Sequence, residues 1–182
     1  MAAKRDLLLT AARLLLMFFI GVLTFAAGAI ALVLPIVIGF QSRVLAEFAK
    51  KGMDAGPELI GAILILLAGV AALLALAVYF LVLLRRIVLS VGDGDPFIPE
   101  NAERLSRMGW TVLIGQVASI PVGAMVLWIA TLVEDTPGAG HADVHSDFGF
   151  SGGGLLLMLV LFILARVFRR GAEMREELEG TV

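Results

Sequence analysis

Long apolar stretches separated by short polar segments dominate the chain. Four stretches lack Asp, Glu, Lys, Arg and His altogether: 14–42, 59–84, 108–133 and 148–165. About 20 apolar residues cross a hydrocarbon layer of about 30 Å as a helix. The stretches do not alternate apolar and polar residues, as the strands of a membrane barrel would. The pattern therefore predicts an all-α fold, a four-helix transmembrane bundle that forms a single integral membrane domain over residues 1–182.

The first stretch also has features of a signal peptide. Lys4 and Arg5 precede it, and the small residues Ala27-Gly28-Ala29 resemble a cleavage site. A cleaved apolar segment is about 7–15 residues long, whereas this one continues well past the small residues. We therefore expect a retained helix, with Pro35 giving the kink or tilt that takes up its excess length.

Lysine and arginine are distributed unevenly between the segments that flank the spans. Both terminal segments and the middle loop together carry eleven of them, the first loop carries three, and the third loop, 134–147, carries none. Cytoplasmic segments of membrane proteins hold an excess of these residues, so both termini are expected in the cytoplasm. Trp110 and Trp128 would lie about 27 Å apart along a helix, which suits one indole at each membrane interface.

Composition narrows the class of protein. Apolar residues make up 60% of the chain and charged residues 16%, with a formal net charge of −2. Soluble domains carry about 25% charged residues. These values exclude a soluble enzyme, a disordered tail and a nucleic-acid binder that works through a basic surface. The chain has no cysteine, which excludes disulfides, zinc–thiolate sites and thiol nucleophiles, and we expect no cofactor.

Small residues recur on one face of the third span. Gly115, Ser119 and Gly123 form a packing ridge that lets helix backbones approach closely. Contacts within one chain and the seam of a homodimer both use such a ridge, and both interpretations stay open. Gln116, beside the ridge, is expected to bond a neighbouring helix. No ionisable residue lies inside any span, which disfavours proton relays and ion-coupled transport.

One motif suggests catalysis and has a simpler explanation. Residues 149–153 match G-x-S-x-G, but a nucleophile elbow needs a strand before the serine and an α/β sheet around it. An intramembrane serine protease needs a histidine on a neighbouring helix, and His141 and His145 both lie in the adjoining loop. We therefore expect Ser151 to cap the N-terminus of the last span, and we expect no enzyme activity.

The third loop groups metal-ligand residue types. Imidazoles and carboxylates together suit a divalent ion such as zinc or manganese. An exposed polar loop is the alternative interpretation, and pH sensing by the histidines is a further one. The candidate ligands are His141, Asp143, His145 and Asp147.

The middle loop has the chemistry of a turn followed by a new helix. Residues 92–96 read Gly-Asp-Gly-Asp-Pro, and Pro99 suits the first turn of a helix that leads into the third span. Phe97 lies between the two and should be buried at the inner ends of spans two and four. Its expected neighbours are residues such as Leu84 or Phe168.

The fourth span is expected to continue as a cytoplasmic helical tail over residues 166–179. Its arginines come first, at the level of the lipid headgroups, and its acidic residues come last. Acids near a helix C-terminus oppose the helix dipole, so helix stability does not explain them. The tail is either a solvated end or a docking face for a basic partner.

Two stretches resemble the family labelled domain of unknown function 2975. They are Gly94-Asp95-Pro96-Phe97 followed by Asn101 and Leu105, and residues 164–171 followed by 176–182. The resemblance implies a small bacterial membrane protein with four spans. No catalytic or binding residues are established for that family. Its members are often encoded beside a small Cro-type helix-turn-helix regulator, which implies a membrane partner of a transcription factor.

We therefore expect a non-enzymatic regulatory or interaction protein of the bacterial cytoplasmic (inner) membrane. Its expected partners are the lipid bilayer, a cytoplasmic transcription regulator and a second copy of the chain, with no direct contact to nucleic acid. The alternatives are a transport or channel component with a path along Gln116, Ser119 and Thr131, and an intramembrane enzyme that uses Ser151. The candidate cytoplasmic surface consists of Asp95, Pro96, Phe97, Asn101, Arg169, Arg170 and Glu176.

Overall fold

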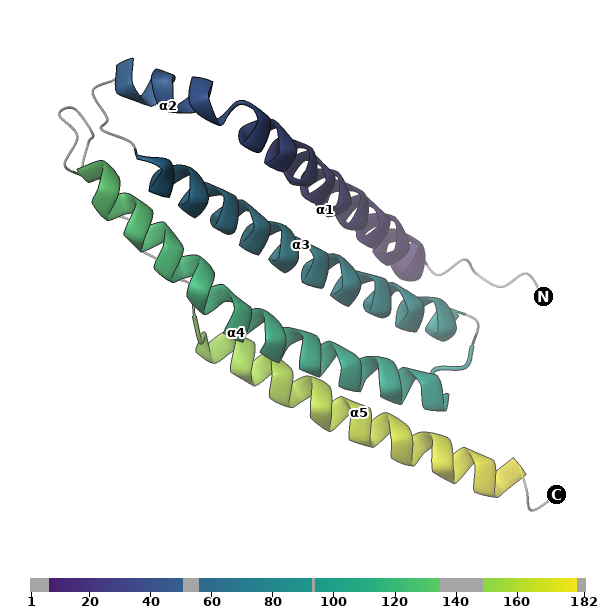
Figure 1. Ribbon diagram of the computed structural model, residues 1–182. Helices are drawn as coiled ribbons and strands as arrows, with labels where there is room; N and C mark the ends of the chain where they lie inside the picture. The colour runs from purple at the N-terminus through teal and green to yellow at the C-terminus, as the bar shows by residue number, and fades with distance from the viewer. Residues whose placement is uncertain (1–6, 51–55, 93, 135–148, 180–182) are drawn as a thin grey trace. The chain divides into compact units, whose positions relative to one another are not determined.

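The fold is all-α over the part of the chain that the structure, a computed structural model, describes. That part comprises residues 7–50, 56–92, 94–134 and 149–179. Its helices are labelled in Figure 1. They are α1 (Leu7–Gly39), α2 (Gln41–Lys50), α3 (Pro57–Gly92), α4 (Pro99–Glu134) and α5 (Gly152–Glu179). The helices α1, α3, α4 and α5 are long and apolar enough to cross a membrane, which confirms the predicted four-span fold.

The helices extend beyond the apolar stretches from which they were predicted. Both α3 and α4 contain 36 residues, which corresponds to about 54 Å. A hydrocarbon layer is about 30 Å thick, so both helices are longer than a membrane requires. Arg85 and Arg86 end the apolar stretch in α3 but do not end the helix, since arginine is a good helix former.

The first helix ends earlier than the apolar stretch from which it was predicted. The helix α1 stops at Gly39, three residues before the end of the stretch, and α2 begins at Gln41. The amide of Phe40 still donates to the carbonyl of Ile36 at 2.9 Å, which completes the last turn of α1. In α2, Arg43, Glu47 and Lys50 recur at helical spacing, so this short helix is amphipathic.

Contacts group the chain into two compact units. Unit 1 comprises Met1–Thr24, Leu76–Ile114 and Gly152–Val182. Unit 2 comprises Phe25–Ala75 and Gly115–Ser151. Unit 1 therefore includes the end of α3, the start of α4 and the whole of α5.

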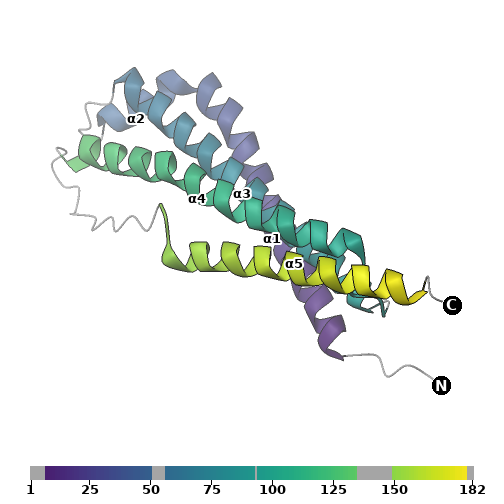
Figure 2. The ribbon, with the colours of Figure 1, turned by 90° about the horizontal axis from the view of Figure 1, so that it is seen from below.

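The core of unit 1 forms where α5 packs on α3 and α4. In Figures 1 and 2, α5 runs beside the first part of α4. Gly109 permits this approach, because a Cβ added there would lie 3.0–3.2 Å from three atoms of the Phe162 ring. The buried core residues are Leu83, Ile87, Leu105, Met108, Leu161 and Ala165.

Unit 2 contains its own close approach, between α3 and α4. A Cβ added to Gly69 would lie 2.7 Å from Cγ2 of Val122, a buried residue. The part of α1 in this unit is far less buried, with Phe25 79% and Leu32 69% exposed. Lipid tails solvate such side chains as well as a protein core does, so this exposure suits a membrane span.

Candidate functional site

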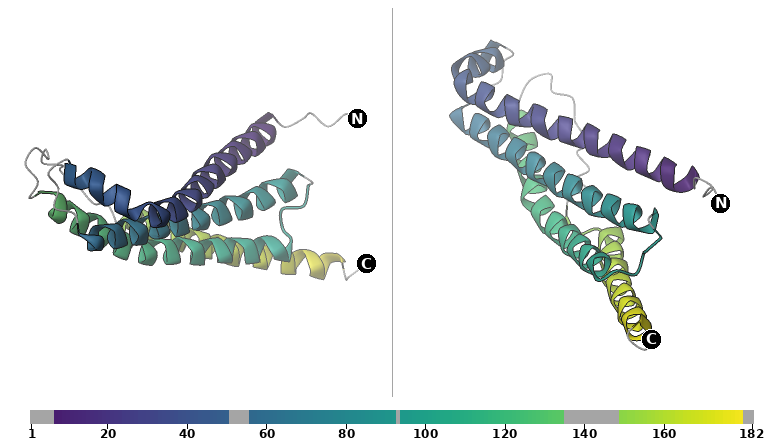
Figure 3. Two further views of the ribbon diagram at one scale, coloured as in Figure 1. Left: turned by 45° about the horizontal axis from the view of Figure 1, so that its top comes forward. Right: turned by 90° about the vertical axis from the view of Figure 1, so that its right-hand side faces the viewer.

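A tight turn connects α3 to α4 in unit 1, as the right-hand view of Figure 3 shows. The amide of Gly94 donates to the carbonyl of Val91, and that of Asp95 donates to the carbonyl of Ser90, both at 3.2 Å. Gly94 has a φ of +87°, a left-handed conformation that favours glycine after a helix end. The turn predicted from Gly92–Pro96 is therefore present in its described residues, and α4 starts at Pro99 as expected.

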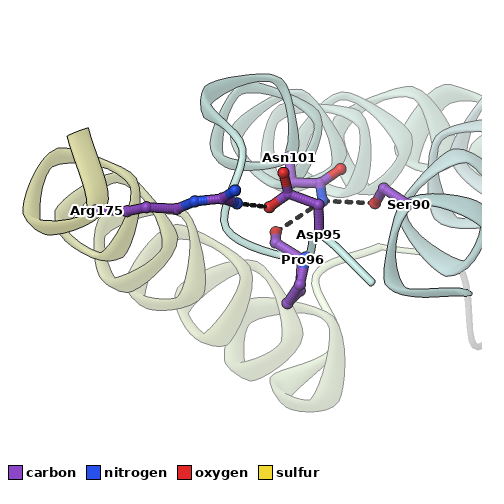
Figure 4. Close-up of polar contacts among 5 residues, drawn as sticks. All are labelled: Ser90, Asp95, Pro96, Asn101 and Arg175. Atoms are coloured by element: carbon purple, nitrogen blue, oxygen red, sulfur yellow. Dashed lines mark hydrogen bonds and ion pairs between the residues drawn. The ribbon is translucent and has the colours of Figure 1, made fainter. Parts of the chain in front are cut away.

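Asn101 holds this turn against the end of α3. Its side chain is completely buried. Nδ2 donates to Oγ of Ser90 at 2.7 Å and to the carbonyl of Pro96 at 2.9 Å (Figure 4). Oδ1 accepts from Arg104 Nη1 at 2.7 Å. The hydroxyl of Ser90 in turn donates to the carbonyl of Ile87 at 2.8 Å. One amide side chain thus fixes the conformation of residues 95–98.

Phe97 fastens the turn to α5. The centroid of its ring lies 5.2 Å from that of Phe168, with the ring planes inclined at 42°. A Cβ added to Gly171 would lie 2.6 Å from Cδ1 of Phe97, so only glycine leaves room for the ring there. The predicted contact between Phe97 and Phe168 is confirmed, although the side chain is 43% exposed rather than buried.

An ion pair strengthens the same connection. Arg175 Nη1 contacts Oδ1 of Asp95, and both side chains are partly exposed (Figure 4). We call these contacts the loop–tail junction, defined by Asp95, Phe97, Phe168, Gly171 and Arg175. A cavity of about 240 Å³ adjoins the junction. Its lining residues are Asp95, Phe97, Ile98, Pro99, Ala172, Arg175 and Glu176.

The predicted cytoplasmic surface divides into two parts. Glu176 lines the cavity with Asp95 and Phe97, so these three residues come together. Arg169 and Arg170 lie apart from them and line a different cavity with Arg166 and Glu173. The predicted set is thus two separate surfaces, one shared by the loop and α5 and one on α5 alone. The prediction is wrong for Asn101, whose side chain is completely buried because it bonds the turn from inside.

The packing ridge on α4 is less uniform than its spacing suggests. A Cβ added to Gly115 would meet no atom within 4 Å, so close packing at this glycine is not found. Gly123 is buried. Ser119 is partly buried, and its hydroxyl donates to the carbonyl of Gln116 at 2.7 Å and accepts from the amide of Gly149 at 3.1 Å. Close packing of α4 is found instead at Gly109, against the Phe162 ring of α5.

Gln116 was expected to bond a neighbouring helix, and it bonds Ser151, the residue directly before α5. It is 8% exposed, and its Oε1 accepts from the amide of Ser151 at 2.9 Å. Its Nε2 is buried and has no hydrogen-bond partner within the described ranges. Ser151 directly precedes α5, which is the N-cap position predicted for it.

The predicted metal ligands cannot be compared with the fold. His141, Asp143, His145 and Asp147 lie outside the described residues. Within residues 7–50, 56–92, 94–134 and 149–179, no group of three or more His, Asp or Glu side chains is arranged to hold a metal ion.

Sequence reasoning missed several residues of the site. Ser90, Arg104, Gly171 and Arg175 all take part in its contacts. Gly171 and Arg175 are four residues apart and therefore share a face of α5. That spacing is the one sequence signal that links them, and it does not identify the loop as their neighbour.

Comparisons with known proteins identify a family but no function. The family model described as "Protein of unknown function (DUF2975)" matches residues 47–182. Searches of the curated proteins and of the solved structures found no match.

Proposed function

The chain belongs to the DUF2975 family of proteins of unknown function, and we propose that it is a non-enzymatic interaction protein of the bacterial cytoplasmic membrane. Its long apolar helices make it a multi-pass membrane protein. In this proposal both termini and the loop–tail junction lie in the cytoplasm, because lysine and arginine are concentrated in the segments at that end. A protein partner binds the loop–tail junction and the C-terminal end of α5.

The loop–tail junction is the observation that carries this proposal. The ion pair between Asp95 and Arg175 and the ring contact between Phe97 and Phe168 join segments far apart in sequence. Asn101 additionally fixes the backbone of the loop. The loop and the tail therefore form one surface, and a shift of α5 against α4 changes the shape of that surface.

The charge of the tail indicates the chemistry of the partner. Glu173, Glu176 and Glu177 are exposed near the C-terminal end of α5. Acidic residues there oppose the helix dipole, so helix stability does not explain them. A helix-turn-helix regulator neutralises DNA phosphates with lysine and arginine, and its basic face complements this tail. The chain itself makes no direct contact with nucleic acid in this proposal.

Co-purification with a candidate regulator tests the proposal. The chain is produced together with a small helix-turn-helix regulator of the kind that the family resemblance implies, and the regulator is measured in the membrane fraction and after detergent extraction. The unaltered chain should retain the regulator. Glu176→Lys with Glu177→Lys should reduce retention about tenfold, because like charges then face each other. Glu47→Lys with Glu58→Lys changes the charge equally at exposed positions on α2 and α3 and should have no effect.

A second variant alters the shape of the loop–tail junction without changing the charge of the tail. Phe97→Ala removes the ring that contacts Phe168 and should weaken retention of the regulator while membrane insertion stays normal. A regulator that remains in the soluble fraction with the unaltered chain would contradict the proposal. Full retention by both the charge variant and Phe97→Ala would place the interaction elsewhere on the chain.

The rival functions have less support. A transport path was expected along Gln116, Ser119 and Thr131. The hydroxyls of Ser119 and Thr131 instead donate to carbonyls of their own helix, and Thr131 is exposed. Only Gln116 Nε2, without a hydrogen-bond partner among the described residues, favours a transport path. An intramembrane enzyme would need a histidine beside Ser151, and both histidines lie outside the described residues.

A further inference from the structure

Three arginines lie on the face of α5 that points away from the core of unit 1. Ala165, Phe168 and Ala172 belong to the side of α5 that packs inward. Arg166 and Arg170 lie at the opposite side, Arg169 lies on the flank beside Arg166, and all three are exposed. We call these three residues the arginine face. Together with Glu173 they line a cavity of about 240 Å³.

The arginine face carries an excess of positive charge. Arg170 is near Glu173, with 3.6 Å between Nη1 and Oε2, and both side chains are more than half exposed. Neither Arg166 nor Arg169 lies within 4.0 Å of a carboxylate in the part of the chain that the structure describes. Residues three and four apart on a helix have neighbouring side chains, so these guanidinium groups can reach a single anion. Guanidinium matches the oxygen geometry of phosphate and binds it in bidentate fashion.

An exposed apolar stripe leads directly to the arginine face. Leu159 is 53% and Ile163 54% exposed, and Ile163 precedes Arg166 by three residues and Arg170 by seven. These spacings place all four residues along one side of α5. The stripe lies within a candidate membrane span, so acyl chains cover it. The same side of one helix therefore offers an apolar surface for a lipid tail and, at its end, cations for a headgroup.

An aromatic pair marks the level at which the stripe meets the arginines. The Trp110 ring of α4 meets the Phe162 ring of α5 edge to face, with centroids 5.7 Å apart, and Trp110 is 55% exposed. Phe162 lies one helical turn before Arg166. Exposed tryptophan is typical of the membrane–water interface, where headgroup and acyl chain meet.

From these features we infer that the arginine face and the adjoining stripe bind one anionic phospholipid. The headgroup phosphate contacts Arg166 and Arg169, and one acyl chain follows Leu159 and Ile163. A zwitterionic lipid cancels its phosphate with its own cation, so it gains less from the unpaired arginines. Each arginine near an anionic surface contributes about fivefold to affinity, which gives about 25-fold for the two.

Quenching of Trp110 by brominated lipid tests the site in the full chain. Trp128→Phe leaves Trp110 as the sole tryptophan. The protein is reconstituted in phosphatidylcholine vesicles with increasing fractions of phosphatidylglycerol or phosphatidylcholine brominated on the acyl chains. Brominated phosphatidylglycerol should quench Trp110 at a much lower fraction than brominated phosphatidylcholine does. Equal quenching by the two lipids would overturn the inference.

Matched variants test whether the arginine face causes the preference for phosphatidylglycerol over phosphatidylcholine. Arg166→Gln with Arg169→Gln should remove it, while quenching by brominated phosphatidylcholine stays unchanged and shows that the fold is intact. Arg43→Gln with Lys50→Gln removes the same charge from α2 and should keep the preference. A preference that survives the first pair, or is lost in the second, would overturn the assignment. Inorganic phosphate should not compete, and displacement of the lipid by phosphate would identify a phosphate site instead.

Discussion

Two buried amide side chains on α4 have different surroundings. Asn101 lies at the end of α4 beside the α3–α4 turn, and both its donor and its acceptor atoms are bonded. Gln116 lies within the apolar stretch of α4, where Oε1 is bonded and Nε2 has no partner among the described residues. Asn101, at the helix end, therefore fixes the turn with all its polar atoms bonded. Gln116, inside the span, bonds the residue that precedes α5 with its oxygen, while its nitrogen has no partner among the described residues.

The two amides contribute differently to stability. Removing Asn101 leaves the partly buried carbonyl of Pro96 without its donor, and an unsatisfied group costs more than the hydrogen bond itself. Removing Gln116 takes away one bond and one unsatisfied donor together, so the two effects offset each other.

Asn101→Ala should lower the free energy of unfolding by about 3 kcal/mol, because the carbonyl of Pro96 and the guanidinium of Arg104 both lose a buried partner. Unfolding in mixed detergent, followed by circular dichroism, measures the change. Ser90→Ala is the control. It removes a single bond of Asn101 and should cost about 1 kcal/mol. Equal costs for the two variants would show that Asn101 does not organise the turn.

Gly109→Leu should destabilise the chain by about 2 kcal/mol, because the new side chain displaces the Phe162 ring and separates α4 from α5. Gly115→Leu enters open space and should change stability little, although the sequence had suggested the opposite for this ridge position. The same unfolding assay compares them. Similar losses at both positions would mean that the packing of α4 is not centred on Gly109.

Gln116→Leu should change the free energy of unfolding by less than about 1 kcal/mol. The lost bond to Ser151 is offset by removal of the unsatisfied Nε2 group. Comparison with Asn101→Ala in one detergent sharpens the contrast between the two amides. A loss at Gln116 as large as that at Asn101 would indicate that its Nε2 has a partner in the membrane.

Arg175→Gln should cost only about 0.5 kcal/mol, since its ion pair with Asp95 is partly exposed to water. The cost should shrink as salt is added, because mobile ions screen exposed charges. Unfolding measured at low and high salt checks both points. A cost that does not depend on salt would contradict an electrostatic origin.

The elements that the sequence predicted are those with a local signal. Long stretches without ionisable residues identify the four spans, and the glycine and proline pattern of 92–99 identifies the turn and the start of α4. Phe97 could be placed against Phe168 because the turn leaves its ring at the end of the fourth span. The bonds of Asn101 are also local, reaching three to eleven residues along the chain, but its partners Ser90 and Arg104 were not predicted.

The elements that escaped prediction depend on tertiary contacts or on weak patterns. The helix α2 is short and contains charged residues, so a search for uncharged stretches passes over it. The chain has 20 glycines, and only the packing of α5 shows that Gly109 and Gly171 face aromatic rings. The partner of Gln116 lies 35 residues away, beyond any helical spacing.

Thiol cross-linking gives the most direct test of the loop–tail junction, because the natural chain has no cysteine. The Cβ position of residue 171 lies 3.3 Å from Cγ of Phe97, which places the two Cβ atoms within reach of a disulfide. Phe97→Cys combined with Gly171→Cys, in membranes under mild oxidation, should form a disulfide that protects both thiols from a polymer-linked maleimide. Phe97→Cys combined with Arg169→Cys places the second thiol on the arginine face and should leave both thiols reactive. Rapid protection of the first pair alone is the expected result, and equal reactivity of the two pairs would contradict the junction.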